Sequence, residues 1–181
     1  MIIKNCLARW QFGVFLYFFI LVSLSGCAAK MAVTPQITDI EIESDFQLGG
    51  VVEYDGNKDY LPRTIKEDPS QTLFSFRYDY QVAYGRDKTP QAIPLYNPLT
   101  IVGFPIGDNT MVVTANLAIL KGKEVVKAYT ATCGLEQVRS LFSEGETFSE
   151  LRKKGLVTVR DNIELQIYRD RDLLSSLASS D

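Results

Sequence analysis

Residues 72–84 read T-L-F-S-F-R-Y-D-Y-Q-V-A-Y, and this stretch decides the fold class. Large apolar or aromatic side chains alternate here with small or polar ones; the large set is Phe74, Phe76, Tyr78, Tyr80, Val82 and Tyr84. Successive side chains of a β-strand point to opposite faces of a sheet. The period of two therefore predicts a long strand with one buried face and one solvated face.

A β-hairpin is predicted downstream of this strand. Residues 110–120 and 124–133 both alternate and are rich in β-branched side chains, and Lys121-Gly122-Lys123 separates them as a short turn. Gly134 is expected to end the second strand. Shorter strands are expected at 37–43, 51–54 and 99–104, with a loop or single helical turn at 57–70, a loop at 86–98 and a turn at 105–109.

The C-terminal part changes from a period of two to a helical period. A short helix is expected at 135–142. Thr147-Phe148-Ser149-Glu150 then has the form of a capping box, and apolar residues at three-to-four spacing continue to Leu177. A helix of this extent, about 30 residues, is about 45 Å long. Residues 163–167 also alternate, so a strand at 156–168 stays open as the alternative.

These elements predict an α+β fold: an antiparallel sheet of about four to five strands with a long C-terminal helix packed on its apolar face. Residues 37–181 are expected to form this single globular domain. No internal repeat or low-complexity run interrupts it, and the mature length is sufficient for one core.

The first 26 residues have a different character. Lys4 and Arg9 precede a run at 12–24 that is apolar apart from Gly13 and Ser23. A helix of thirteen residues spans about 20 Å of a hydrocarbon core about 30 Å thick, which suits a signal peptide better than a transmembrane helix. The alternative is an uncleaved transmembrane helix over residues 10–29.

Leu24-Ser25-Gly26-Cys27 resembles the lipobox of bacterial lipoproteins, and it follows a basic region and an apolar run in that family's order. The resemblance implies cleavage between Gly26 and Cys27, a diacylglyceryl group on Cys27 and acylation of the new amine. Several acyl chains anchor a protein stably to a bilayer. Ala28 is not the Asp that retains lipoproteins of this family in the inner membrane, so the outer membrane is expected, with the domain facing the periplasm.

Residues 27–36 are interpreted as the lipidated N-terminus and a short tether. The nine residues 28–36 reach about 30 Å when stretched and about 17 Å as a coil, so the domain is expected close to its membrane. Any protein partner is then expected near the same membrane.

Charge and composition exclude several function classes. Residues 1–26 contain two basic side chains and no acid, so the mature chain has 17 basic and 22 acidic side chains. A net charge near −5 argues against nucleic acid or anionic lipid as a partner, because binding to either needs a basic patch. The chain has no histidine, which removes Ser-His and Cys-His nucleophile pairs and the usual catalytic zinc sites. No enzyme activity and no cofactor are predicted, although a carboxylate-based hydrolase stays open.

Cysteine usage leaves one thiol in the mature chain. Cys6 lies in the predicted signal peptide and Cys27 is expected to carry lipid, so Cys133 has no partner for an intrachain disulfide. We expect Cys133 to pack as a small apolar residue near a strand end.

The aromatic side chains of 74–84 have two interpretations. They are the core face under the helix, or they form a platform for sugar rings or an apolar ligand. A buried Tyr hydroxyl needs a hydrogen-bond partner, so Tyr80 and Tyr84 are expected toward the sheet margin. Together with Tyr96, Phe104 and Ile106, they are the candidate contact residues for a ligand or partner.

Two polar segments have simpler interpretations. Asp55-Gly56-Asn57-Lys58-Asp59 has oxygen ligands at alternate positions, as a calcium loop does. However, the position of its glycine, and the residue at the twelfth position counted from Asp55, do not match a calcium loop. A solvated turn is therefore expected, and no metal site is predicted. Arg169-Asp170-Arg171-Asp172 is interpreted as a solvated helix face.

Two function hypotheses follow. The first is a non-enzymatic accessory or assembly factor that binds a membrane-proximal envelope protein; the hairpin and helix broadly resemble small auxiliary envelope lipoproteins, without diagnostic residues. The alternative is a lipoprotein that binds a glycan or lipid. A deep apolar cavity beside Tyr80 and Tyr84 favours the alternative, whereas a filled core with an exposed edge strand or apolar patch favours the first.

Overall fold

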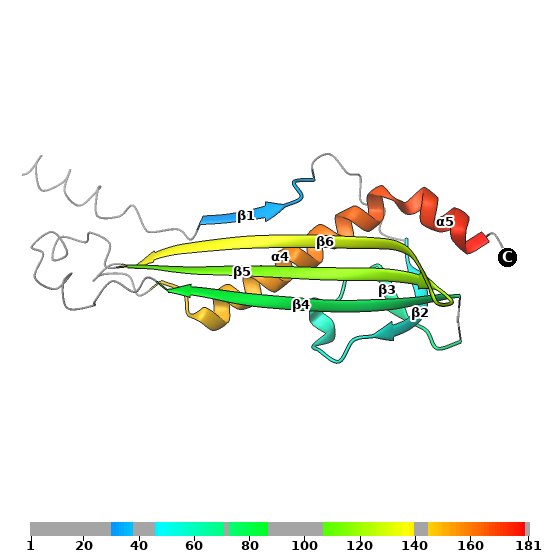
Figure 1. Cartoon of the computed structure of the whole chain (residues 1–181), viewed down its shortest axis with the longest axis horizontal. Coiled ribbons are helices and arrows are strands. Elements are labelled where there is room, and N and C mark those ends of the chain that lie inside the picture. The colour runs from blue at the N-terminus through cyan, green and yellow to red at the C-terminus, as the bar shows by residue number, and fades with distance from the viewer. Residues whose placement is uncertain (1–29, 38–45, 71–72, 87–106, 140–144, 180–181) are drawn as a thin grey trace, which may run out of the picture. The chain divides into compact units, whose positions relative to one another are not determined.

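The computed structural model describes residues 30–37, 46–70, 73–86, 107–139 and 145–179 (Figure 1). Described residues within Lys30–Arg86, Asn109–Glu136 and Glu146–Asp181 form one compact unit. Residues 107–108, 137–139 and Gly145 belong to a second unit. The sheet and helices discussed below belong to the first unit, apart from the ends of two strands.

The first unit is built on a six-stranded sheet with the order β1-β6-β5-β4-β2-β3. The strands are β1 (Lys30–Thr34), β2 (Leu48–Glu53), β3 (Ile65–Glu67), β4 (Phe74–Arg86), β5 (Gly107–Lys121) and β6 (Glu124–Arg139). The helices are the 3₁₀ turn η1 (Lys58–Tyr60), α4 (Phe148–Arg169) and α5 (Arg171–Ser179). The prediction of an α+β fold with a C-terminal helix is confirmed.

The long strands follow the predicted pattern. β4 covers the alternating stretch and pairs antiparallel with β5 over its whole length, and β5 and β6 form the predicted hairpin. Gly122 in the turn has a φ of 65°, a left-handed conformation that glycine adopts without strain. β2 covers residues 51–53 of the strand predicted at 51–54 and starts three residues earlier.

The prediction of a purely antiparallel sheet is wrong, because β2 runs parallel to both β3 and β4. A two-residue turn forces antiparallel pairing, whereas a longer connection lets the chain return in the same direction. The chain between β2 and β3 includes η1 and supplies that length. The sheet also has six strands instead of four to five.

Four local predictions are also wrong. Residues 30–34, interpreted as part of a tether, form β1, which pairs antiparallel with β6. Gly134 does not end β6, and the predicted helix at 135–142 is strand as far as Arg139. The period of two continues there, because Cys133, Leu135 and Gln137 are all buried.

Residues 107–109, predicted as a turn, are the start of β5. The predicted strands at 37–43 and 99–104 fall almost wholly outside the described residues.

The predicted C-terminal helix is present but interrupted. Thr147 caps α4: its hydroxyl accepts from the N–H of Glu150 at 3.2 Å, and its own N–H donates to the Glu150 carboxylate at 2.7 Å. Residues 156–168 are helical throughout, so the strand alternative is wrong. The helix ends at Asp170, and α5 begins at the next residue.

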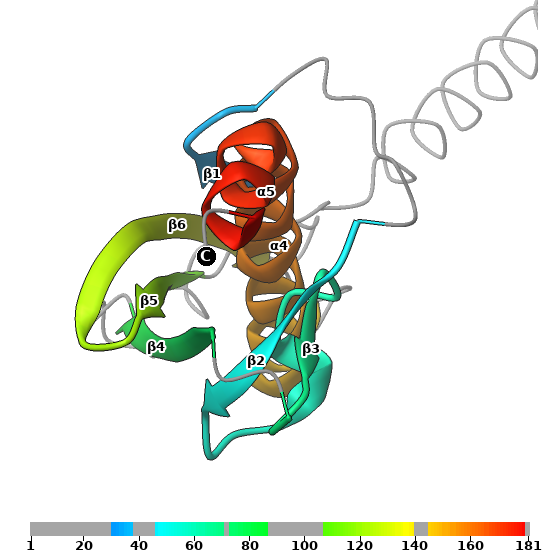
Figure 2. The ribbon, with the colours of Figure 1, turned by 90° about the vertical axis from the view of Figure 1, so that its right-hand side faces the viewer.

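The three long strands curl around α4, which occupies their concave face (Figure 2). The buried residues of these strands are Phe74, Phe76 and Tyr78; Met111, Val113, Ala115, Leu117, Ile119 and Leu120; and Tyr129, Ala131, Cys133, Leu135 and Gln137. α4 contributes Leu151, Leu156, Val159, Ile163 and Ile167 at helical spacing. This core fills the interior between sheet and helix.

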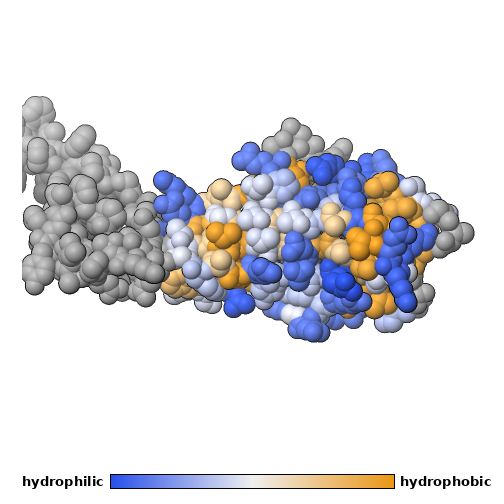
Figure 3. Space-filling view, viewed as in Figure 1, coloured by the Kyte–Doolittle hydropathy of each residue, from blue (hydrophilic) through white to orange (hydrophobic). Residues whose placement is uncertain are grey.

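The convex face of the sheet is more polar (Figure 3). Asn116 donates to Asp79 at 3.2 Å and accepts from Thr130 at 2.9 Å, which links three strands. The hydroxyls of Thr114 and Thr132 lie 3.1 Å apart. The alternation predicted for β4 therefore separates a packed face from a solvated one.

Candidate binding surface

One edge of β4 is open over most of its length. β2 pairs with β4 only at Ser75, Phe76 and Arg77. Within the described part of the chain, no strand pairs with that edge from Tyr78 to Arg86. Natural sheets usually protect such an edge with lysine, proline or a bulge. This segment contains neither lysine nor proline, so its backbone N–H and C=O groups are a template for another strand.

The aromatic side chains along β4 pass from core to surface toward its C-terminal end. Phe74, Phe76 and Tyr78 are buried, as the core interpretation predicts. Tyr80 is half-buried, and Tyr84 is 54% exposed. The expectation that Tyr80 and Tyr84 lie at the margin of the packed face therefore agrees with their positions.

Both of these tyrosines contact the first turns of α4. Arg152 donates through Nη2 to the Tyr80 hydroxyl at 3.2 Å, and its guanidinium carbon lies 6.0 Å from the Tyr80 ring centroid. The Tyr80 hydroxyl bond raises the pKa of Arg152. The rings of Tyr84 and Phe148 meet edge to face with centroids 5.8 Å apart. Aromatic and cationic groups therefore line the concave side beside the open edge.

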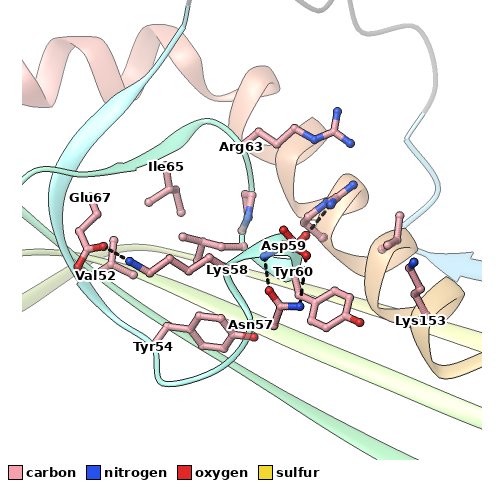
Figure 4. Close-up of a pocket in the computed structure, with 14 residues that line it drawn as sticks. Val52, Tyr54, Asn57, Lys58, Asp59, Tyr60, Arg63, Ile65, Glu67 and Lys153 are labelled. Atoms are coloured by element: carbon pink, nitrogen blue, oxygen red, sulfur yellow. Dashed lines mark hydrogen bonds and ion pairs between the residues drawn. The ribbon is translucent and has the colours of Figure 1, made fainter. Parts of the chain in front are cut away.

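A groove of about 650 Å³ lies between the β2–β3 connection and α4 (Figure 4). Its lining combines Tyr54 and Tyr60, the cations of Lys58, Arg63, Lys153 and Arg160, the carboxylates of Asp59 and Glu67, and apolar side chains that include Val52, Ile65 and Val157. Sequence reasoning missed this groove. Its two walls are about 90 residues apart in the chain, and only tertiary packing brings them together.

Arg160 fixes one wall of the groove to the other. Its Nη1 donates to the backbone carbonyl of Asp59 at 2.6 Å, and its Nε and Nη2 donate to the Asp161 carboxylate at 2.8 and 2.6 Å. The residue is 7% exposed. A buried guanidinium with three charge-assisted or backbone bonds is rigid, so η1 is held firmly against α4.

The other charged groups of the groove are closer to solvent. Lys58 forms an ion pair with Glu67 across the β2–β3 connection. Lys153 lies on the α4 wall of the groove and forms no ion pair with the residues that the structure describes (Figure 4). The mouth of the groove therefore offers a cation to an incoming group.

Two phenol hydroxyls near the groove lack a hydrogen-bond partner among the described residues. Tyr54 and Tyr78 meet edge to face with ring centroids 5.1 Å apart, and neither hydroxyl is bonded. Burial raises the pKa of both groups, with a further contribution to Tyr54 from the nearby phenols of Tyr80 and Tyr60. Each hydroxyl is buried without a partner in the described part of the chain, which costs folding free energy.

The segment 55–59 forms a turn. Asn57 caps η1 by accepting the backbone N–H of Asp59 at 3.0 Å, and its amide donates to the Asp59 carboxylate at 3.3 Å. No cluster of three or more cysteine or carboxylate side chains suited to a metal occurs in the part of the chain described.

The interpretation of 169–172 as a solvated face is wrong for Asp170. Its carboxylate is 17% exposed, lies 2.7 Å from the ammonium of Lys127 and accepts from the Tyr129 hydroxyl at 3.3 Å. Its N–H also bonds to the last turn of α4. This residue therefore joins the end of α4 to β6.

Cys133 is fully buried, and burial raises the pKa of its thiol. It lies within β6 and not near its end. Gly26, Cys27, Tyr96, Phe104 and Ile106 lie outside the described residues, so the proposed lipid anchor and three of the candidate contact residues stay predictions.

Comparison with known proteins finds no matching protein-family model and no matching curated protein. Among the helices that the structure describes, none combines the length and hydropathy needed to cross a bilayer.

Proposed function

We propose that this protein is a lipid-anchored envelope lipoprotein that acts as a non-enzymatic accessory or assembly factor. Residues 1–26 are removed, Cys27 carries the acyl chains, and the domain faces the periplasm from the outer membrane. The domain binds another envelope protein close to the same membrane. The open edge of β4 from Tyr78 to Arg86 is the observation that carries this proposal.

Strand addition is the binding mode that such an edge supports. An extended segment of a partner pairs its backbone with the edge strand, and its alternate side chains enter neighbouring pockets. The segment would run beside Tyr80 and Tyr84, where Arg152 and Lys153 supply positive charge. We therefore infer an extended partner segment in which apolar side chains alternate with acidic ones.

A glycan or lipid ligand is the second candidate, and the groove beside η1 favours it. Two tyrosines and several cations suit a ligand with ring faces and acceptor oxygens. However, neither this groove nor a second one of about 520 Å³ around Phe46 and Tyr168 is lined by Tyr80 or Tyr84. The edge of β4 therefore has priority.

The proposal is tested by photo-crosslinking in cells. A photoreactive amino acid replaces Gln81 or Ala83 on β4, with Val125 at the hairpin as the control position, and cross-linked proteins are identified by mass spectrometry. We expect one envelope protein from both β4 positions and not from Val125, and loss of that product when Cys27→Ser removes the anchor.

A peptide from the cross-linked segment then tests the binding mode. We expect the peptide to bind the purified protein, and N-methylation of its backbone or Arg152→Glu to weaken binding about tenfold or more, equivalent to about 1.4 kcal/mol. Cross-links only to this chain itself, or binding that tolerates N-methylation at every position, would contradict strand addition.

A further inference from the structure

β1 shortens the distance between the domain and its proposed anchor. Only Ala28 and Ala29 separate Cys27 from Lys30, the first residue of β1. Besides its pairing with β6, this segment is bound to α4. Thr158 donates to the sulfur of Met31 at 3.4 Å, and Asn162 donates to the carbonyl of Pro35 at 2.8 Å. The link from Cys27 to the folded domain is therefore at most about 10 Å long.

The paired strands show which end of the sheet this link leaves from. Thr34 of β1 pairs with Thr132 of β6, and Gln81 of β4 pairs with Thr114 of β5. Because the hydroxyls of Thr132 and Thr114 lie 3.1 Å apart, these four residues form one row across the sheet. The start of β1 lies on the same side of that row as the end of β4. The hairpin turn at Gly122 lies at the opposite end of the sheet.

Exposed apolar side chains gather at the end where the link begins. Met31 on β1 and Tyr84 on β4 each lie three residues from that row, at opposite edges of the four strands β1-β6-β5-β4. The side chain of Met31 is 55% exposed, and that of Tyr84 is 54% exposed. Phe148, in contact with Tyr84, is 37% exposed. Val112 is 43% exposed on the other face of the sheet.

Three of these four side chains lie on the side of the sheet that carries α4. Met31 contacts α4 through Thr158, and Tyr84 contacts it through Phe148. The next turn of α4 exposes three consecutive basic residues, 152–154. Aromatic side chains beside lysine and arginine are typical of the interfacial layer of a bilayer, where rings sit among headgroups and cations reach phosphates.

We propose that the surface formed by Met31, Tyr84 and Phe148, the anchor-side patch, rests in the interfacial layer of the bilayer that holds the acyl chains. This inference rests on the proposed lipid anchor. Because only two residues separate Cys27 from β1, the link holds the sheet close to the bilayer, with its α4 side toward the membrane.

This orientation explains why a partner at the β4 edge would be close to the membrane. The open edge ends at Arg86, near the anchor-side patch, whereas the hairpin turn points away. From Met111 to Lys121 the strand extends about 33 Å, so the opposite end of the sheet stays clear of the lipid.

Tryptophan fluorescence tests the orientation, because Trp10 is the only tryptophan in the chain. The full chain with Trp10→Phe is expressed in bacteria, purified and reconstituted in vesicles of phosphatidylethanolamine and phosphatidylglycerol, with or without brominated acyl chains. Single tryptophans replace Phe148 or Tyr84. The matched controls are Val125→Trp and Leu173→Trp, at positions 53% and 48% exposed away from the patch. Protection of Cys133 from thiol reagents verifies that each variant is folded.

We expect brominated lipid to quench the tryptophans at 148 and 84 at least about twofold more than those at 125 and 173, because only a ring in the interfacial layer meets the bromine. Equal quenching at all four positions, or stronger quenching at 125 and 173, would overturn the inference while leaving an acylated Cys27 in place. Mass spectrometry of the same samples separates the two proposals, since an unmodified Cys27 would remove the anchor and the orientation together.

Discussion

Gly155 of α4 lies directly against Val113 of β5: a Cβ atom at this position would stand 2.6 Å from Cγ2 of Val113. The same atom would lie 3.0 Å from Cδ1 of Leu135. Both partners are buried, and the β-branched Val113 has little freedom to turn away. Glycine in the middle of this helix is therefore a packing requirement.

Gly155→Ala is expected to destabilise the fold by about 1 kcal/mol. Overpacking a core costs about 2 kcal/mol, and the better helix propensity of alanine offsets about 1 kcal/mol of that cost. Urea denaturation measures the difference. Gly134→Ala is the matched control, because the nearest atom to a Cβ there is 4.0 Å away. A Gly155→Ala variant as stable as the wild type would show that α4 is not held against β5.

Asp170→Ala is expected to destabilise the protein by about 2 kcal/mol. The change leaves the Tyr129 hydroxyl and the Lys127 ammonium without their acceptor, and a buried donor left unpaired costs about 1–3 kcal/mol. Tyr129→Phe removes the hydroxyl and is expected to cost less. In a double-mutant cycle, Asp170→Ala should cost less in the Tyr129→Phe background than in the wild type. Fully additive effects would contradict the contact.

The capping box predicts a pH-dependent difference between the wild type and Glu150→Gln. The backbone N–H of Thr147, followed by its hydroxyl, donates to the Glu150 carboxylate and lowers its pKa. A lowered pKa stabilises the folded state above the ordinary Glu value, and this contribution is lost as the pH falls through the folded-state pKa. The wild type should therefore be the more stable protein at neutral pH, and the difference should disappear in acid.

Thermal denaturation of both proteins between pH 2 and pH 7 measures this difference. Glutamine keeps an acceptor oxygen, so the comparison isolates the charge. Glu124→Gln is the control, since it removes a carboxylate near the hairpin turn, away from any helix N-terminus. A difference between the wild type and Glu150→Gln that stays constant down to pH 2 would argue against the cap.

Cys133 is expected to be unreactive in the folded protein. Its side chain is fully buried, and burial raises the pKa of the thiol, so little thiolate is present or accessible. A maleimide should label the purified protein only in denaturant, as measured by mass spectrometry. Lys123→Cys at the exposed hairpin turn is the positive control and should react at once. Rapid labelling of native Cys133 would show that β6 is not packed as described.

Local periodicity predicted the parts of the fold that are continuous in sequence. β4, the hairpin and the capped start of α4 each follow from side chains a few residues apart, because strand alternation and helix capping are short-range effects. The same reasoning placed Tyr80 and Tyr84 at the margin of the packed face. It failed at 135–139, where the apolar spacing also fits a helix and the pairing of β6 with β1 favours the strand.

The sequence by itself determined an α+β domain, an alternating strand with a packed face and a solvated face, and a capped C-terminal helix. Only the tertiary structure decided that β2 runs parallel to β4 for three residues, and that no other strand among the described residues pairs with the rest of that edge. It alone decided that residues 30–34 join the sheet and that Arg160 closes a groove against η1. These features depend on contacts between residues far apart in the chain, and no local pattern of side chains encodes which strand meets which.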